Sequence, residues 1–128
     1  MGVSFIRYFY IWFGLNGMVA ILFAAFASHS GINPYQLELI NKASNYQLLH
    51  SIIGMFAVFT ANNSLKSTAS ILLFSIGIIC FSYSLYLKGM GIINSAPFAP
   101  IGGICYAFGH LVLGIYCFGK YGKNNTSS

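Results

Sequence analysis

Four long stretches without a charged residue constrain this chain more than any other feature. They cover residues 8–37, 43–65, 67–87 and 89–119. A helix needs about 20 mostly apolar residues to cross a bilayer, so each stretch can hold one transmembrane helix and none comfortably holds two. We therefore predict an all-α integral membrane protein whose four transmembrane helices form an antiparallel bundle.

The charge composition supports the same class of protein. Charged residues make up 5% of the sequence, whereas they make up about a quarter of a soluble domain. The six basic residues are dispersed along the chain and form no stripe, which argues against nucleic acid as a partner. A lipid bilayer is the partner that this composition predicts.

The positions of the charges predict the orientation of the helices. With four spans, both termini share one side of the membrane with the loop after the second helix. That side receives Arg7, Lys66, Lys120 and Lys123, while the other receives Lys42, Lys88 and the only carboxylate, Glu38. The positive-inside rule then places both termini in the cytoplasm.

We expect a single domain over residues 1–128, with helices at about 8–28, 44–62, 68–88 and 99–119 and a disordered tail at 121–128. Ser44 or Asn45 would cap the second helix, and residues 35–42 would form a separate interfacial helix. Pro100 would occupy the first turn of the fourth helix, where its missing N–H costs nothing.

The first helix has an alternative interpretation. Arg7, the apolar run and the tripeptide Ala25-Phe26-Ala27 resemble a secretory signal that is cleaved before Ser28. The run is longer than the usual signal core of about 7–15 residues, which favours a retained helix. Cleavage would leave three helices, and the sequence leaves this alternative open.

Polar side chains gather near the ends of three predicted helices. Tyr46, Gln47 and His50 lie within one turn of the second helix, and Ser82, Ser84 and Tyr86 lie at the end of the third. Small residues continue the face of the second helix, which we expect to turn inward. In the fourth helix a four-residue stripe runs through Gly102, Tyr106, His110 and Gly114. The cysteines Cys80, Cys105 and Cys117 are odd in number and lack a pairing pattern, so we expect buried thiols.

Three ordered blocks resemble the small four-helix membrane proteins catalogued as domain of unknown function 423. The blocks are Phe23 to His29, the turn with Tyr46, Gln47 and His50, and Phe81 to Tyr86 together with Pro100 to Gly103. That family includes uncharacterised bacterial inner-membrane proteins and a vertebrate transmembrane relative. The resemblance implies four helices in a membrane, most simply the bacterial inner (plasma) membrane, and it implies no activity.

The chain departs from the family pattern in two places. Ala24, Ala25, Ala27 and Ser28 stand where the family usually has glycines, and His110 stands where it usually has an aromatic residue. The first departure weakens any expectation of very close backbone contact before His29. The second marks His110 as particular to this chain.

In the four-helix topology, the polar groups would form a cap at the outer membrane face. Gln47 and His50 would bond to Ser82, Tyr86 or the free amides at the start of the fourth helix, because unpaired polar groups are costly in lipid. The residues that we assign to this cap are His29, Tyr46, Gln47, His50, Ser82, Ser84, Tyr86, Asn94, Pro100, Gly102 and Gly103.

Several functions remain open for these residues. His29, His50 and His110 are candidates for binding a metal, haem or quinone, although no third clustered metal ligand is evident. A transport path would run past Asn16 and His110, and a nucleophilic Ser82 or Ser84 would lack a carboxylate to orient His50. We therefore expect no enzymatic activity and no cofactor. A structural, assembly or accessory subunit of a larger membrane complex is the leading prediction, and a homo-oligomer is the alternative.

Overall fold

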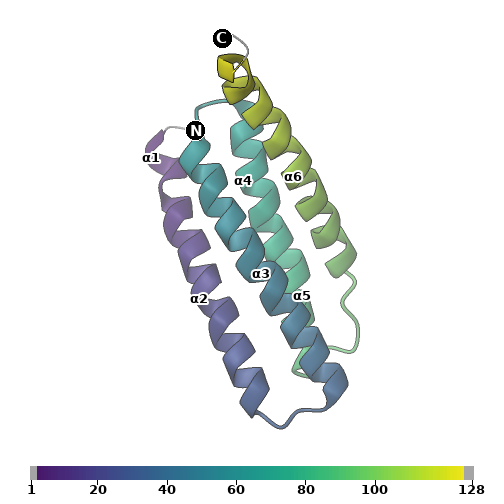
Figure 1. Cartoon of the computed structure of the whole chain (residues 1–128). Helices are drawn as coiled ribbons and strands as arrows, with labels where there is room; N and C mark the ends of the chain where they lie inside the picture. The colour runs from purple at the N-terminus through teal and green to yellow at the C-terminus, as the bar shows by residue number, and fades with distance from the viewer. Residues whose placement is uncertain (1–2, 126–128) are drawn as a thin grey trace.

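The computed structural model describes residues 3–125, and its regular structure within that range is entirely helical. Four long helical segments lie side by side, and successive segments run in alternating directions (Figure 1). They are α2 (Tyr8–His29), α3 (Pro34–Thr60), a rod made of α4 (Leu65–Gly77), the π-helix η1 (Ile78–Tyr83) and α5 (Ser84–Gly89), and α6 (Ala99–Tyr121). The short α1 (Val3–Ile6) precedes α2, and the 3-10 helix η2 (Gly122–Asn125) follows α6. The all-α prediction is confirmed.

Three of the four segments are long and apolar enough to cross a membrane. Within the described residues these are Ser4–His29, Leu65–Gly89 and Ala99–Tyr121. The exception, α3, is long enough at 27 residues, but Asn45, Gln47 and His50 interrupt its apolar sequence. The chain thus has the character of a membrane protein, and α3 is its most polar helix.

The start of α3 differs from the prediction. The helix begins at Pro34, and the Asn33 side chain caps it by accepting a hydrogen bond from the Gln36 backbone N–H at 2.9 Å. The Gln36 side chain in turn accepts from the Asn33 backbone N–H, which completes a capping box. The predicted start at Ser44 or Asn45 is wrong because this box, with Pro34 in the first turn, begins the helix ten residues earlier. The expected interfacial helix and the second helix are one continuous segment.

The predicted tail also differs in part. α6 continues to Tyr121, and residues 122–125 form η2 rather than a disordered segment. Residues 126–128, where the rest of the predicted tail falls, lie outside the described range. Pro100 lies in the first turn of α6, as expected.

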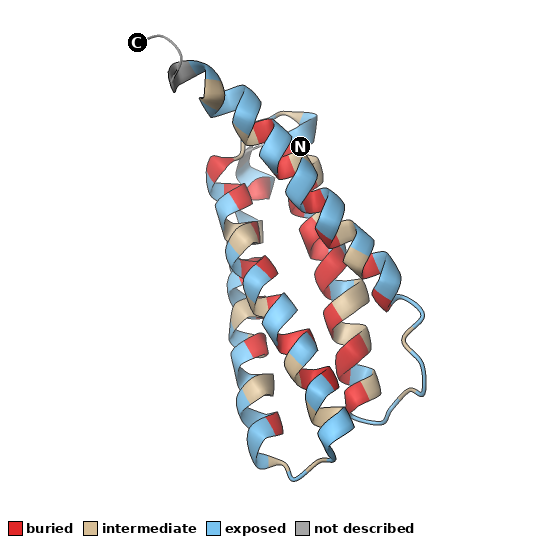
Figure 2. Ribbon diagram, turned by 45° about the vertical axis from the view of Figure 1, so that its right-hand side comes forward, coloured by how far each residue is buried: buried red, intermediate tan, exposed pale blue. Residues whose placement is uncertain are grey.

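Glycines opposite aromatic rings allow the helices to pack closely. A Cβ atom at Gly54 would come within 2.3 Å of the Phe13 ring, and one at Gly77 within 2.4 Å of the Tyr106 ring. The rod packs against both α3 and α6, whereas α2 packs mainly on α3. Buried residues therefore form a stripe along the inner side of each helix (Figure 2).

The backbones of α6 and η1 approach each other closely at Gly102. A Cβ atom there would lie 2.4 Å from the backbone nitrogen of Phe81 and 2.9 Å from the carbonyl carbon of Cys80. The predicted stripe through this residue is only half buried, since Gly102 and Tyr106 face inward while His110 and Gly114 are exposed. A step of four residues overshoots a 3.6-residue turn, so the stripe rotates away from the bundle.

One end of the bundle is closed by hydrogen bonds to the last carbonyl of α3. The Tyr116 hydroxyl and the Lys120 ammonium both donate to the carbonyl oxygen of Thr60. This carbonyl has no partner within its own helix because it belongs to the last turn. The two bonds join the end of α3 to the end of α6.

Gly102→Ala should destabilise the bundle, because the new methyl group meets backbone atoms that cannot move aside. Overpacking of this kind costs about 1–3 kcal/mol, which thermal melting in detergent would show as a decrease of several degrees. Gly114→Ala is the matched control, since a Cβ atom there has nothing within 4 Å. Equal melting curves for both variants would contradict the close approach.

Candidate functional site

A buried polar network joins three helical segments in the interior of the bundle. It consists of Asn16 on α2, Gln47 on α3, Tyr83 on η1 and Tyr86 on α5. The Tyr86 hydroxyl donates to Gln47 Oε1 at 2.6 Å, and Gln47 Nε2 donates to Asn16 Oδ1 at 2.9 Å. The Tyr83 hydroxyl donates to the same Asn16 oxygen at 2.6 Å. Gln47 is fully buried at 0% exposure, so its amide depends on these protein partners.

Bonds to backbone carbonyls extend the network along α2 and α3. Asn16 Nδ2 donates to the Trp12 carbonyl at 2.8 Å, and the Ser44 hydroxyl donates to the Ala20 carbonyl at 2.7 Å. The Ser51 hydroxyl donates to the Gln47 carbonyl at 2.6 Å. The bond from Ser44 crosses between helices, so α2 and α3 are joined through both side chains and backbone.

The π-helix η1 explains how the rod contacts helices on two sides. A π-helix is wider than an α-helix, and such segments often mark functional sites. Tyr83 extends from η1 to Asn16 on α2, while the neighbouring Ser82 lies 3.2 Å from the Tyr106 hydroxyl on α6. Adjacent residues of one segment therefore bond to the first and the last long helix.

A second group of rings lies between α3 and α6. We call it the His50 ring cluster, and it contains Tyr46, His50, Tyr106 and His110. The His50 ring stacks on Tyr106 with centroids 3.6 Å apart, and His110 meets His50 edge-on at 5.2 Å. His50 is 3% exposed, whereas Tyr46 and His110 are exposed. The cluster thus extends from the interior to the outer surface of the bundle.

Both histidine rings of this cluster are held in the same way. His50 Nδ1 lies 2.6 Å from the Tyr46 carbonyl, and His110 Nδ1 lies 2.8 Å from the Tyr106 carbonyl. A carbonyl oxygen only accepts, so Nδ1 is the donor in each ring. A backbone carbonyl on Nδ1 is also the usual orienting contact of a histidine whose Nε2 binds a ligand.

The structure brings together only some of the predicted cap residues. Gln47 and Tyr86 bond directly, and Gly102 lies against η1. His50 bonds to its own helix and contacts the rings of Tyr106, His110 and Phe74 rather than Ser82 or Tyr86. His29 is exposed at the last position of α2 and Asn94 is exposed in the connection before α6, both apart from the network. No bond of Ser84 to the network appears among those of the described residues.

The network lies deeper in the bundle than predicted, because its residues on α3 are not in the first turn of that helix. Because α3 begins at Pro34, Gln47 is its central residue, about 20 Å of helix rise from either end. His110 is likewise the central residue of α6. The polar groups lie inside the bundle, and the residues that the prediction placed in a first turn are part of an unbroken helix.

Sequence reasoning missed Tyr83 and underrated Asn16. Asn16 is the only amide residue in α2, which was a usable signal, although it was considered only as a possible lining of a path. Tyr83 stands three residues before Tyr86, a spacing that places both rings on neighbouring parts of one helix face. This spacing was also a usable signal, although it does not indicate that Tyr83 bonds to α2.

Two of the three candidate ligand histidines, His29 and His50, lie far apart in the bundle. His29 lies at the end of α2 and His50 in the middle of α3, so the two histidines occupy different levels of the bundle. Among the residues that the structure describes, no group of three or more His, Cys, Asp or Glu side chains could hold a metal ion. The three cysteines are free and partly buried.

The fold and the network define a small helical membrane protein with a hydrogen-bonded polar interior. A family model described as "Protein of unknown function (DUF423)" matches residues 23–103, and the chain belongs to this family. Gln47, Tyr83 and Tyr86 lie within the matched range, whereas Asn16, Tyr106 and His110 lie outside it. Comparisons with curated proteins and with solved structures found no match.

The bond between Gln47 and Tyr86 is expected to be cooperative with the rest of the network. In a double-mutant cycle, Gln47→Met and Tyr86→Phe should each lower the melting temperature, and the double variant should lose less than the sum. Interhelical hydrogen bonds in membranes average about 0.6 kcal/mol, with values up to about 1.7, and a fully buried bond should approach the upper value. A control cycle pairs Gln47→Met with Tyr10→Phe, which is exposed on α2. Additive effects in both cycles would refute the coupling.

Proposed function

We propose that this protein is a structural, assembly or accessory subunit of a larger membrane complex in the bacterial inner membrane. In this proposal all four long helices cross the bilayer in an antiparallel bundle, α2 is retained, and both termini are cytoplasmic. α3 crosses despite its polarity, because Gln47 and His50 are buried against the other helices.

The observation that carries the proposal is the position of His110. It is the central residue of α6 and is exposed on the outside of the bundle, among exposed apolar side chains such as Phe108 and Leu111. Polar side chains at membrane depth usually face a bundle interior or pair with other polar groups. A neighbouring subunit that packs on α6 would supply such a pairing.

The distribution of burial agrees with a partner on the outer helices. In their most apolar windows, 17% of the first segment and 28% of α6 are buried, compared with 56% of the rod. Among the described residues, every buried polar side-chain atom except Trp12 Nε1 has a hydrogen-bond partner within the chain, so a partner subunit would bind the outer faces. Gly114 leaves open space on α6, which would allow another helix to approach closely.

Affinity purification of the full chain in mild detergent tests this proposal. We expect a different protein to co-purify in a fixed ratio, and we expect His110→Leu to reduce that ratio. His29→Leu is the matched control, because His29 is also exposed but lies at the end of α2. A pure homo-oligomer, or equal recovery of the partner with both variants, would contradict the subunit function.

A ligand-binding function is the second candidate, and the His50 ring cluster favours it. Two rings oriented by backbone carbonyls, one buried and one exposed, would suit a haem, quinone or other small molecule better than His29 with His50 does. In this case α6 would be covered by a ligand rather than by a subunit.

His50→Ala separates the two candidates. If His50 serves the packing of the bundle, its removal should lower the melting temperature by several degrees, since it leaves a cavity beside Tyr106. If His50 also serves a ligand, an optical band or bound metal of the wild-type protein should disappear in the variant as well. The wild-type spectrum and metal analysis are the reference, and a featureless spectrum without metal would exclude haem.

A further inference from the structure

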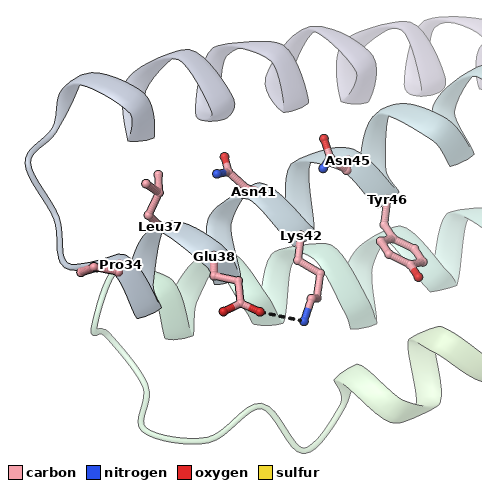
Figure 3. Close-up of a pocket in the computed structure, with 7 residues that line it drawn as sticks. All are labelled: Pro34, Leu37, Glu38, Asn41, Lys42, Asn45 and Tyr46. Atoms are coloured by element: carbon pink, nitrogen blue, oxygen red, sulfur yellow. Dashed lines mark ion pairs between the residues drawn. The ribbon is translucent and has the colours of Figure 1, made fainter.

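A hollow of about 540 Å³ lies along the exposed face of the N-terminal half of α3. Figure 3 shows its side chains in two rows: Leu37, Asn41 and Asn45 form one, and Glu38, Lys42 and Tyr46 form the other. Each row repeats every four residues, so both run along the helix while rotating slowly about its axis. The hollow thus combines one anion, one cation, two amides and an aromatic ring on a single helix.

The depth of the hollow corresponds to the boundary of a bilayer. The other end of the bundle is marked by Thr60 and Lys120, which bond to each other. Measured along α3 from Thr60, Lys42 lies at about 27 Å and Glu38 at about 33 Å. The hydrocarbon core of a bilayer is about 30 Å thick. If Thr60 lies at one boundary, the charged pair straddles the opposite boundary, with Glu38 in the head-group layer and Lys42 just inside it.

The two charges remain available to a ligand. Lys42 Nζ lies 3.6 Å from Glu38 Oε1, and the side chains are 48% and 70% exposed. An exposed pair with this spacing stabilises a helix by only about 0.3–0.5 kcal/mol. Little stability is therefore lost if the pair opens to accept a ligand that carries both charges.

We propose that this hollow binds the head group of a phosphatidylethanolamine-type phospholipid, which rests on the membrane orientation proposed above. The lipid phosphate would bind Lys42, and its ammonium group would bind Glu38, the only carboxylate in the chain. Asn41 and Asn45 offer both N–H donors for the phosphate and carbonyl oxygens for the ammonium group.

The inner end of the hollow fits the rest of such a lipid. Tyr46 is 44% exposed and stands one turn closer to the bilayer centre than Lys42. On the same scale Tyr46 lies about 21 Å from Thr60, below the head-group layer, so its ring would pack on the acyl chains of the bound lipid. A choline head group has the same charges but no ammonium N–H, so the carboxylate and the amides should distinguish the two lipids.

Native mass spectrometry of the delipidated full chain tests the proposal. The protein in detergent is titrated with dioleoyl phosphatidylethanolamine, phosphatidylcholine or phosphatidylglycerol. We expect phosphatidylethanolamine to be retained about two- to fivefold better than phosphatidylcholine, as a partly exposed ion pair allows. Glu38→Gln should abolish this preference and raise the relative retention of phosphatidylglycerol, whereas Lys42→Met should reduce the retention of all three lipids.

Lys66→Met is the matched control, because Lys66 is an exposed lysine at the opposite end of the bundle. Equal retention of the three lipids by the wild type, or equal losses in the Lys42 and Lys66 variants, would overturn the proposal. Displacement of the lipid by an equal concentration of glycerophosphoethanolamine would also overturn it, since the site would then be one for a soluble ligand.

Failure of this proposal and failure of the subunit function can be told apart. Lipid retention is measured on the purified chain without any partner, so a missing partner does not affect it. The membrane orientation is checked separately by labelling a Lys42→Cys variant with a membrane-impermeant thiol reagent from outside the cell, with the wild-type protein as the reference for its native cysteines. If position 42 is labelled from outside the cell but the protein retains the three phospholipids equally, the lipid site is refuted and the proposed orientation is not.

Discussion

The hydrogen bonds of Gln47 are the interaction on which the rest of the structure depends. A primary amide at 0% exposure inside an apolar bundle must find partners within the protein. Gln47 finds one on α2 and one on α5, so a single side chain fixes the relative positions of three segments. Tyr83 adds a second bond to Asn16. Because directed bonds tolerate little displacement, this network specifies which faces of the helices meet.

Close packing supplies what the network does not. The rings of Phe13, Phe74 and Tyr106 fill space opposite Gly54, Gly109 and Gly77, and Gly102 allows α6 to reach the backbone of η1. In lipid, helices associate through packing and hydrogen bonds rather than through a hydrophobic driving force. The same π-helix serves both purposes, since it carries Tyr83 toward α2 and Ser82 toward α6. The interior residues of the bundle therefore serve mainly to hold the helices together.

Because the interior side chains are used in contacts within the chain, the proposed functions lie on the outer surface. The interior amides and hydroxyls have protein partners, whereas His110, Tyr46 and the charged pair of Glu38 and Lys42 are exposed. Each exposed polar group sits at a definite level: His110 at the middle of α6, and the charged pair near the end of α3. The family to which the chain belongs is described as one of unknown function, so it assigns no activity to these residues. The level of each group in the membrane is what suggests a subunit contact in one case and a lipid in the other.

Charge spacing was sufficient to predict the helical class and the four long helices, because these depend on the distribution of apolar residues along the chain, which the sequence displays directly. The family was recognised from three residue blocks, and the high cost of unpaired polar groups in lipid was sufficient to predict Tyr86 among the bonding partners of Gln47. The tertiary structure alone decided that α3 starts at Pro34, because the Asn33 capping box competes with a weaker start at Ser44. It alone separated His29 from His50 and paired Tyr83 with Asn16. The separation of the two histidines follows from the early start of α3, which places His50 in the middle of that helix. The bond between Tyr83 and Asn16 depends on the rotation of each helix about its axis, which is set by contacts between segments distant in the sequence.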